Sequence, residues 1–346
     1  MRNITETGYQ SLILGELPEG CKLCVKGRKS VLFATGLCSQ NCWYCTISKK
    51  KWQSDEKCIN EKEIKNNKDI LEEVKFCGSK GVGITGGEPT VKIDRVCSFI
   101  KLLKENFGSR FHIHMYSCGK NIPLSSLEKL NKAGLDEIRF HKDKDIVKKA
   151  LDFSWDVGME VPVIPKTEKK ICSLIDYLEK IEAKFINLNE LEFSERNVKA
   201  MESRGFKLRN NSLTAVSSSR ETALTVLKHA IPMNINVHFC TADLKMNFQL
   251  RNRLINRANN IKKPFEKVTR DGFLKKGIVF GDSLEKIEVA VKKANIPYFV
   301  NKNRKRIEIS ESKAKALAKK IKFKVAVVEE YPTSDPWDFE LTPLNY

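Results

Sequence analysis

Short apolar runs alternate six times with longer amphipathic stretches between positions 29 and 203. The runs fall at residues 31–35, 82–85, 111–116, 136–140, 160–164 and 185–188. The stretches between them repeat apolar residues every three or four positions, as in Ile93, Val96 and Ile100, which is the spacing of one helix face. Strands that alternate with helices in this way predict an α/β fold with a parallel sheet covered by helices.

Three cysteines, Cys38, Cys42 and Cys45, follow the first of these runs. Iron–sulfur clusters are usually held by four cysteine thiolates, so a compact group of three leaves one iron of a cubane cluster open to another ligand. A structural zinc site is the general alternative, but such sites normally have four protein donors. The loop also contains the polar residues 39–41, which disfavours a buried group of inert thiols. The favoured interpretation is an iron–sulfur site with an open iron.

A second motif follows the second run, where residues 82–85 lead into Gly86, Gly87, Glu88 and Pro89. Together with the spacing CxxxCxΦC, in which Tyr44 stands before the last cysteine, this GGEP motif resembles the radical S-adenosylmethionine (SAM) superfamily. Within that superfamily the chain looks most like the pyruvate-formate-lyase-activating-enzyme-like branch. The resemblance implies a partial (β/α)6 barrel of the TIM type. In such barrels the chemistry lies at the C-terminal ends of the strands, which is where both motifs fall.

The resemblance also implies the cofactors and the reaction. Cys38, Cys42 and Cys45 would hold a [4Fe-4S] cluster, and SAM would bind at its open iron. One electron, from a donor such as ferredoxin or flavodoxin, would cleave SAM to methionine and a 5′-deoxyadenosyl radical. The radical chemistry then belongs to the cofactor, while the protein positions and shields it.

The same resemblance assigns residues to the parts of SAM. Residues 86–89 would orient the methionyl end, and Tyr44 would border the adenine. Ser117 and Gly119, at the end of the third strand, fall where family members contact the ribose. An ordinary turn between strand and helix is the alternative for this pair.

Polar residues also lie at the ends of the later strands. Arg139 and His141 alternate with apolar residues, so they share one face of the fourth strand. Facing inward, they would meet the SAM carboxylate or the substrate, and facing outward they would be a solvated pair. Further candidates for substrate contacts lie on the sixth strand and just after it: Asn187, Asn189, Glu190 and Glu192.

A second pair of cysteines, Cys21 and Cys24, lies ahead of the first strand. A CxxC pair can be half of a metal site, a redox pair or a coincidence. The flanking Gly20 and Gly27 favour a metal knuckle, and Cys240 is the candidate third ligand at the end of a later strand. We therefore predict an auxiliary site for a second iron–sulfur cluster or zinc. The position of the pair before strand one, near the bottom of the barrel, counts against this prediction unless the N-terminal segment folds back.

The pattern of elements changes after about residue 203. A hairpin is expected at residues 206–216, a helix at 221–231 and a strand at 235–239. From about residue 268 the order is βαββαβ, which is typical of the split-βαβ, ferredoxin-like arrangement. We expect an N-terminal extension with the CxxC pair (1–28), a radical SAM core barrel with its extension (29–260), and a small basic α+β C-terminal domain with a tail (261–346).

The charge of the chain is strongly positive and unevenly distributed. The 346 residues have a formal net charge of +19, and residues 262–330 contain 19 lysines and arginines against 9 acidic residues, a net of +10. Clustered positive charge favours polyanionic partners such as RNA, with phosphate contacts expected from a run on a predicted turn: Lys302, Arg304, Lys305 and Arg306. Solvated surface lysines are the alternative explanation.

Three functions are therefore weighed. The main prediction is modification of a tRNA nucleoside by a radical SAM enzyme. The second is glycyl-radical-type activation, or another modification, of a protein substrate. The third is a non-catalytic iron–sulfur or zinc protein that binds nucleic acid, which the GGEP motif argues against because a binding module needs no clamp for the cofactor amine.

The expected location is cytoplasmic. Eleven cysteines, an odd number with metal-type spacing, indicate a reducing compartment rather than a disulfide scaffold. No apolar run approaches the roughly 18 residues of a membrane span. The N-terminus lacks the apolar stretch of a signal peptide, so no membrane partner is expected.

Overall fold

The computed structural model describes residues 2–346, which form two compact units. The first unit comprises Met1–Val74 and Ser79–Leu250, and the second comprises Lys75–Gly78 and Arg251–Tyr346. The N-terminal segment thus belongs to the same unit as the strands that follow it. No helix among residues 2–346 has the length and apolarity needed to cross a lipid bilayer.

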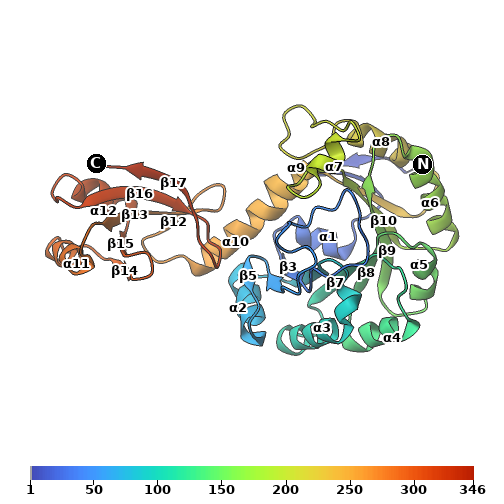
Figure 1. The fold of residues 1–346 in the computed structure, drawn as a ribbon, viewed down its shortest axis with the longest axis horizontal. Coiled ribbons are helices and arrows are strands. Elements are labelled where there is room, and N and C mark those ends of the chain that lie inside the picture. The colour runs from blue at the N-terminus through green and yellow to red at the C-terminus, as the bar shows by residue number, and fades with distance from the viewer. Residues whose placement is uncertain (1) are drawn as a thin grey trace. The chain divides into compact units, whose positions relative to one another are not determined.

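The first unit is built on one curved sheet whose central strands are parallel (Figure 1). Its strand order is β1-β2-β11-β10-β9-β8-β7-β6-β3-β4-β5. The strands are β1 (Thr5–Glu6), β2 (Leu12–Leu14), β3 (Lys29–Phe33), β4 (Cys58–Ile59), β5 (Lys62–Glu63), β6 (Gly81–Thr85), β7 (His112–Ser117), β8 (Glu137–Phe140), β9 (Asp156–Val163), β10 (Phe185–Glu190) and β11 (Asn236–Cys240). The parallel pairs run from β3 through β6 to β11. The expected α/β fold with a partial barrel is confirmed, and all six expected strands are present.

Helices cover the outer face of this sheet, as Figure 1 shows. These helices are α2 (Asn67–Cys77), α3 (Ile93–Phe107), α4 (Leu124–Ala133), the shorter α5 (Asp145–Ala150), α6 (Glu168–Lys180) and α8 (Ser219–His229). In α3 the regularly spaced Val96, Ile100 and Leu103 are fully buried against the sheet. The short elements are α1 (Glu19–Cys24), η1 (Pro89–Lys92), α7 (Val198–Glu202), α9 (Ala242–Leu244) and the π-helix η2 (Lys245–Leu250).

Helix α1 lies on the inner side of the curved sheet, where it packs against β3, β6 and β7 (Figure 1). The Gly20 backbone in α1 comes so close to β7 that an added Cβ would stand 2.5 Å from Nδ1 of His114. Strand β2 pairs with β11 in antiparallel fashion, which extends the sheet beyond the parallel strands. The N-terminal segment therefore fills and edges the barrel instead of lying outside it.

The hairpin expected at residues 206–216 is reduced to one antiparallel bridge, between Leu208 and Val216. The chain does reverse there, and Asn211 adopts a left-handed backbone conformation with φ of 61°. Leu213, which would lie on the apolar face of such a hairpin, is 89% exposed. A two-stranded ribbon needs an apolar face to pack against a third element, so this segment stays a loop.

The second unit is an antiparallel sheet with order β14-β15-β13-β16-β17, and β12 pairs with β13. Its elements are α10 (Arg251–Ile261), β12 (Lys267–Val268), β13 (Leu274–Phe280), α11 (Leu284–Lys293), β14 (Phe299–Asn301), β15 (Arg306–Ile309), α12 (Glu311–Leu317), β16 (Lys324–Glu330) and β17 (Asp338–Pro343). Strands β13 to β16 with α11 and α12 have the ferredoxin-like order that the βαββαβ pattern predicts. Strands β12 and β17 were not expected.

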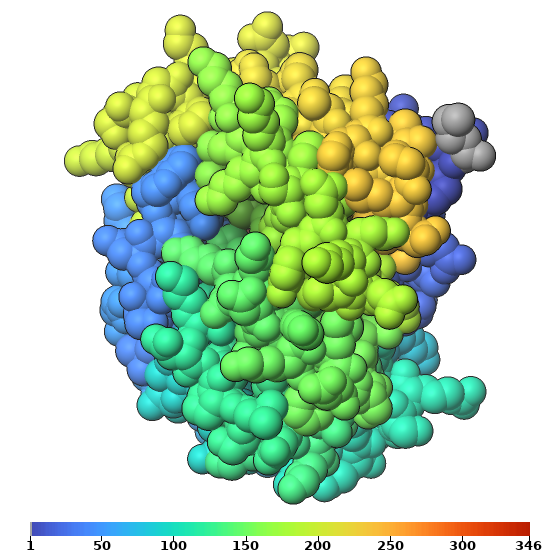
Figure 2. Space-filling model, turned by 90° about the vertical axis from the view of Figure 1, so that its right-hand side faces the viewer, coloured from blue at the N-terminus to red at the C-terminus, as the bar shows by residue number. Residues whose placement is uncertain are grey.

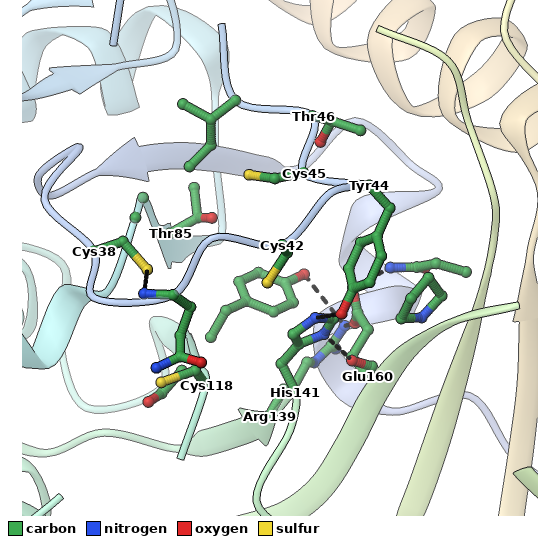
Figure 3. A pocket seen from close by; sticks show the side chains of 18 of the residues that line it. Cys38, Cys42, Tyr44, Cys45, Thr46, Thr85, Cys118, Arg139, His141 and Glu160 are labelled. Atoms are coloured by element: carbon green, nitrogen blue, oxygen red, sulfur yellow. Dashed lines mark hydrogen bonds and ion pairs between the residues drawn. The ribbon is translucent and has the colours of Figure 1, made fainter. Parts of the chain in front are cut away.

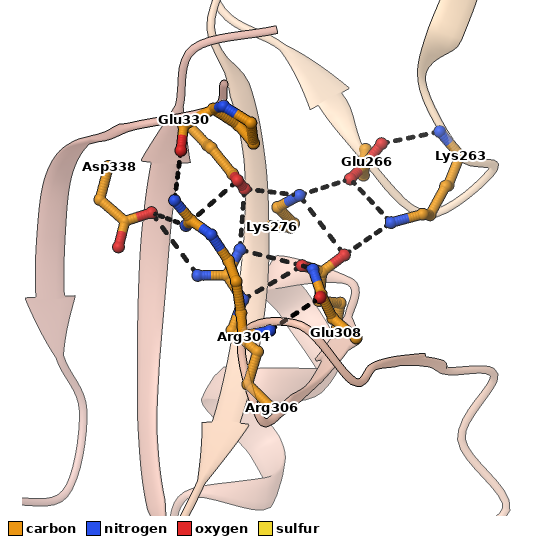
Figure 4. Close-up of polar contacts among 10 residues, drawn as sticks. Lys263, Glu266, Lys276, Arg304, Arg306, Glu308, Glu330 and Asp338 are labelled. Atoms are coloured by element: carbon orange, nitrogen blue, oxygen red, sulfur yellow. Dashed lines mark hydrogen bonds and ion pairs between the residues drawn. The ribbon is translucent and has the colours of Figure 1, made fainter. Parts of the chain in front are cut away.

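A buried ion network holds one face of this second sheet (Figure 4). Glu308 is fully buried and accepts hydrogen bonds from Lys263 Nζ at 2.6 Å and Arg306 Nη2 at 2.9 Å. Lys276 and Arg306 each also reach Glu330 at 2.8 Å. Burial raises the pKa of Glu308, but the Lys276 charge and the hydrogen bonds outweigh it and lower the pKa to about 2.

The same network changes the interpretation of the basic run at residues 302–306. Arg306 is buried within the network, and Arg304 pairs with Asp338 at 2.5 Å. Only Lys302 and Lys305 of the run are exposed. The prediction that all four charges face phosphate groups from a turn is therefore wrong, because the acidic side chains of neighbouring strands bind the two arginines.

We expect Glu308→Gln to destabilise the second unit by about 3–5 kcal/mol, because it leaves buried cations without their counter-charge. Hydrogen exchange of β13, β15 and β16 measures this loss at neutral pH. The folded pKa lies below the ordinary value of 4.5, so the carboxylate stabilises the fold above that pH. The free energies of unfolding of wild type and variant, measured by urea unfolding, should therefore become more similar as the pH falls from 4.5 toward 2.

Glu340→Gln is the matched control, since Glu340 is an exposed carboxylate on β17 of the same unit. It should leave the exchange of β13, β15 and β16 unchanged. Equal exchange in the Glu308 variant and the control would show that the network contributes no net stability.

Candidate functional site

A cavity of about 330 Å³ opens at the C-terminal ends of the barrel strands (Figure 3). It is bounded by the cysteine loop after β3, the loop after β6, the ends of β7 to β10 and the start of η2. Thirteen of the residues predicted from sequence line it: Cys38, Cys42, Tyr44, Cys45, Gly86, Gly87, Pro89, Ser117, Arg139, His141, Asn189, Glu190 and Glu192. Six others do not: Glu88, Gly119, Cys21, Cys24, Cys240 and Asn187.

The three loop cysteines are free, partly buried thiols on the wall of this one cavity. Gln53 fixes the loop, because its amide donates to the Cys38 carbonyl at 2.7 Å. Burial raises the pKa of the Cys42 thiol, but the neighbouring His141 and Lys142 side chains outweigh burial and lower the pKa to about 7. The thiolate, which is the form that binds metal, is thus accessible near neutral pH.

The donor set fits a cluster better than a single ion. No three His, Cys, Asp or Glu side chains within residues 2–346 converge on one metal-sized point. In a cubane cluster each thiolate binds a separate iron, so its ligands stand apart around a cavity, as Cys38, Cys42 and Cys45 do. A fourth cysteine, Cys118 after β7, also lines the cavity, but it lies outside the loop of three.

Two glycines let the loop after β6 touch the cysteine loop. A Cβ on Gly86 would stand 2.3 Å from the Thr35 carbonyl oxygen, and one on Gly87 would stand 2.4 Å from that of Leu37. The Gly87 amide donates to the Thr35 carbonyl at 2.8 Å. Any side chain here would push the two loops apart, so the sequence needs glycine at both positions.

Glu88 turns away from the cavity and ties the loop to the next strand. Its carboxylate accepts hydrogen bonds from Thr90 Oγ1 at 2.7 Å, Ser117 Oγ at 2.9 Å and the Cys118 amide at 2.7 Å. It is only 4% exposed. The position that the resemblance assigns to cofactor binding is thus one whose carboxylate is fully occupied by protein donors, and it positions Gly86, Gly87 and Ser117.

Gly119 has a left-handed φ of 82° and forms the turn after β7, away from the cavity lining. Its amide donates to Ser117 Oγ at 3.1 Å. The hydroxyl of Ser117 therefore joins this turn to Glu88, while the residue itself faces the cavity.

His141 and Tyr44 form a hydrogen-bonded pair at the cavity wall (Figure 3). The Nδ1 of His141 lies 3.0 Å from the Glu160 carbonyl oxygen, which can only accept, so Nδ1 carries the proton. Its Nε2 then accepts from the Tyr44 hydroxyl at 3.0 Å. The pair fixes the ring of Tyr44, which lies between Cys42 and Cys45 in the sequence.

Arg139 faces the barrel interior, not solvent, and its charge is balanced there. It is 3% exposed and pairs with Glu137 at 2.5 Å and Glu160 at 2.8 Å. Burial raises the pKa of Glu160, but the Arg139 charge and the amides of Asn187 and Asn189 outweigh it, so the pKa is lowered and the group is a carboxylate.

Cys21, one of the two cysteines of the CxxC pair, lies against Arg139. Cys21 is buried, and its sulfur lies 3.4 Å from Arg139 Nη2 and 3.5 Å from Asn187 Nδ2. Burial raises the pKa of Cys21 and that of Cys24, to about 12 for Cys24. Cys240 is half-buried, and desolvation of its thiol raises its pKa. Cys21 thus contacts hydrogen-bond donors, not other metal ligands.

Several cavity residues are not predicted from sequence, and two of these, Glu160 and Lys245, carry charge. The expected strand at 160–164 begins four residues earlier, at Asp156, so Glu160 lies mid-strand and points inward. Glu160 shares the lumen face of β9 with Gly158 and Pro162, which lie two residues before and after it, and this two-residue spacing is a signal that the sequence contains. Lys245 follows β11 and pairs with Glu192. No local sequence pattern predicts this contact, because the two residues are 53 positions apart.

We expect Gly87→Ala to displace the cysteine loop and to slow cleavage of SAM by about 100-fold, as displacements of about 1 Å do at catalytic sites. Bound iron after anaerobic reconstitution should fall as well. Gly8→Ala is the control, since a Cβ there meets nothing within 4 Å. Wild-type iron content and rate in the Gly87 variant would show that the close approach is dispensable.

Two families match the chain in comparisons with known proteins. Residues 32–143 match the radical SAM superfamily, and residues 272–344 match a domain of unknown function (DUF8061). The first match covers the cysteine loop, the glycine loop and the strands to β8. The second covers most of the second unit.

One curated relative matches over nearly the whole chain. It is a Methanocaldococcus jannaschii protein named as an activating enzyme for glycyl-radical enzymes, 39% identical over 355 residues that cover 95% of this chain and 93% of that protein. The 7-carboxy-7-deazaguanine synthase of Clostridium acetobutylicum is 28% identical over 167 residues, which cover 42% of this chain and 69% of that enzyme. Among solved structures, Streptococcus suis SuiB bound to precursor peptide SuiA is 16% identical with a TM-score of 0.45. That match covers 63% of this chain and 50% of the SuiB chain, so this chain spans about half the length of SuiB.

Proposed function

The chain belongs to the radical SAM superfamily, and from that premise we propose that it activates a partner polypeptide by removing a hydrogen atom from a glycyl residue. The observation that carries this proposal is the 39% identity, across 95% of this chain, to a protein named as an activating enzyme. The same match covers 93% of that protein, so the two chains correspond over nearly their whole lengths.

The chemistry comes from the bound cofactors. With a reduced [4Fe-4S] cluster and SAM bound, the site would supply one electron that splits SAM into methionine and a 5′-deoxyadenosyl radical, which would take a hydrogen atom from the substrate and become 5′-deoxyadenosine. A small protein such as ferredoxin or flavodoxin would supply the electron. Cys38, Cys42 and Cys45 would hold the cluster.

The chain's own residues divide the cavity between cofactor and substrate. The loops after β3 and β6 and the end of β7 surround the cysteine side, where SAM would lie against Gly86, Gly87 and Ser117. Across the cavity, the ends of β9 and β10 and the start of η2 contribute Glu160, Asn189, Glu192 and Lys245. We assign this polar wall to the substrate, because peptide groups both donate and accept hydrogen bonds.

Modification of a tRNA nucleoside was the main prediction from composition. It rested on the positive charge of residues 262–330 and on the run at residues 302–306. Arg304 and Arg306 of that run are bound in ion pairs, which removes part of its support. RNA is therefore retained as an outcome of the test below.

Cells of the source organism would be grown on deuterated glycine, and their macromolecules would be separated from small molecules. This fraction would then be incubated anaerobically with reconstituted protein, SAM and dithionite. We expect deuterium in 5′-deoxyadenosine by mass spectrometry. Protease treatment of the macromolecules should abolish the transfer, and ribonuclease treatment should leave it unchanged. The opposite pattern would contradict a polypeptide substrate and establish RNA.

Replacing Cys38, Cys42 and Cys45 together by alanine should abolish both the broad visible absorption of the cluster and the formation of 5′-deoxyadenosine. The control is Cys172→Ala, a partly buried thiol on α6 outside the cavity. Continued SAM cleavage by the triple variant would refute the assigned cluster site.

The auxiliary metal at Cys21, Cys24 and Cys240 stays a prediction. If it exists, Cys21→Ala/Cys24→Ala should lower the iron or zinc content without removing the primary cluster. Unchanged contents of both metals would assign the pair to packing against Arg139.

A further inference from the structure

A second hollow lies in the segment that connects β10 to α8, on the same unit as the cavity. It has a volume of about 820 Å³ and is lined by the apolar side chains of Phe193, Val198, Phe206, Leu208 and Leu213, among others. We name this hollow the β10–α8 groove. Leu208 is 49% exposed and Leu213 is 89% exposed. Single exposed apolar residues are ordinary, but two leucines and two phenylalanines around one hollow form a patch of the kind that marks interaction sites.

The groove adjoins the cavity along the chain. Leu191 and Glu192 line the cavity, and Phe193 and Ser194, the next two residues, line the groove. The hydroxyl of Thr214, on the groove, donates to the Glu192 carboxylate at 3.2 Å. A ligand lying in the groove would thus end at the polar wall assigned to the substrate.

The groove also reaches the cysteine loop. Phe206 stacks on Trp43, with ring centroids 5.6 Å apart and planes 7° apart, and Trp43 lies between Cys42 and Cys45 in sequence. In Figures 1 and 2 the yellow part of the chain that includes this segment stands at the upper edge of the unit, and in Figure 2 it lies against the blue part. One wall is thus shared between the groove and the loop that holds the cluster.

We propose that the β10–α8 groove binds an apolar segment of the polypeptide substrate, next to the residue that enters the cavity. This inference rests on the proposed function. A cavity of about 330 Å³ that also receives SAM admits little of a polypeptide, so most of the recognition must occur outside it. The groove supplies apolar surface at the point where such a chain would enter.

The charges at the groove select among possible occupants. Its ionisable lining residues are Glu195, Glu202 and Lys207. Two carboxylates and one ammonium give no excess of positive charge, whereas nucleic acid binding depends on neutralising phosphates with lysine and arginine. An apolar polypeptide segment fits this lining, and RNA does not.

Leu208→Ser/Leu213→Ser is the test, because both side chains are exposed and their loss leaves the core intact. The probe is the protease-sensitive deuterated fraction described above. We expect the concentration that gives half-maximal deuterium transfer to rise at least tenfold. SAM cleavage without that fraction should be unchanged, since neither leucine lines the cavity. Leu124→Ser, on α4 and 53% exposed, is the control and should behave as wild type.

The outcomes separate the two proposals. If deuterium transfer by the wild type is sensitive to protease, and the double variant needs the same concentration of the fraction for half-maximal transfer, the groove assignment is overturned and the proposed function stands. If transfer to the wild type is resistant to protease, the proposed function fails and the groove assignment with it. Light scattering adds a third result: if the wild type is a dimer, the double variant is a monomer and transfer is unaltered, the groove binds a second copy of this chain and the proposal is wrong.

Discussion

Direct contact between two backbone loops holds the site together. The Gly87 amide donates to the Thr35 carbonyl, and the Glu88 amide donates to that of Leu37, both at 2.8 Å. These bonds continue the β3–β6 pairing past the strand ends, and they form only because Gly86 and Gly87 lack side chains. The position of the cysteine loop, and so of any cluster it binds, follows from this contact. Glu88 then fixes the pair of loops to β7 by accepting from Ser117 and the Cys118 amide.

Some of the charged side chains of this protein are buried and pair with one another instead of facing solvent. Both units bury a carboxylate–cation network, with Arg139 between Glu137 and Glu160 in one and Glu308 among several cations in the other. Desolvated ions are stable only with partners in good geometry, so these residues are committed to the fold. A run of basic residues in the sequence therefore does not identify a basic surface, as Arg304 and Arg306 show, because part of the run is paired inside the fold.

Much of the fold and the centre of the site were predictable from the sequence. The strands at residues 82–85 and 185–188 and the ferredoxin-like order were confirmed, because their signals lie in short windows of hydrophobic period. A hairpin is expected at residues 206–216 because the segment contains turn-forming residues. Whether another element packs against it depends on distant parts of the chain, so its own sequence does not reveal that this partner is missing. The carboxylate of Glu88 was assigned to the cofactor because its partners lie about 30 positions away and leave no mark on the motif. The contact of Cys21 with Arg139 spans 118 positions and was equally invisible.

The place of the N-terminal segment has a consequence for the order of events during synthesis. Arg2 donates to the carbonyl of Ile235 at 2.9 Å, and β2 pairs with β11. At ribosomal rates of about 5–20 residues per second, the first strands wait roughly 10–50 s for their partners to emerge. Docking of the first residues is therefore among the last steps of folding, and a bulky fusion at this end would interfere with completion of the barrel rather than with its start.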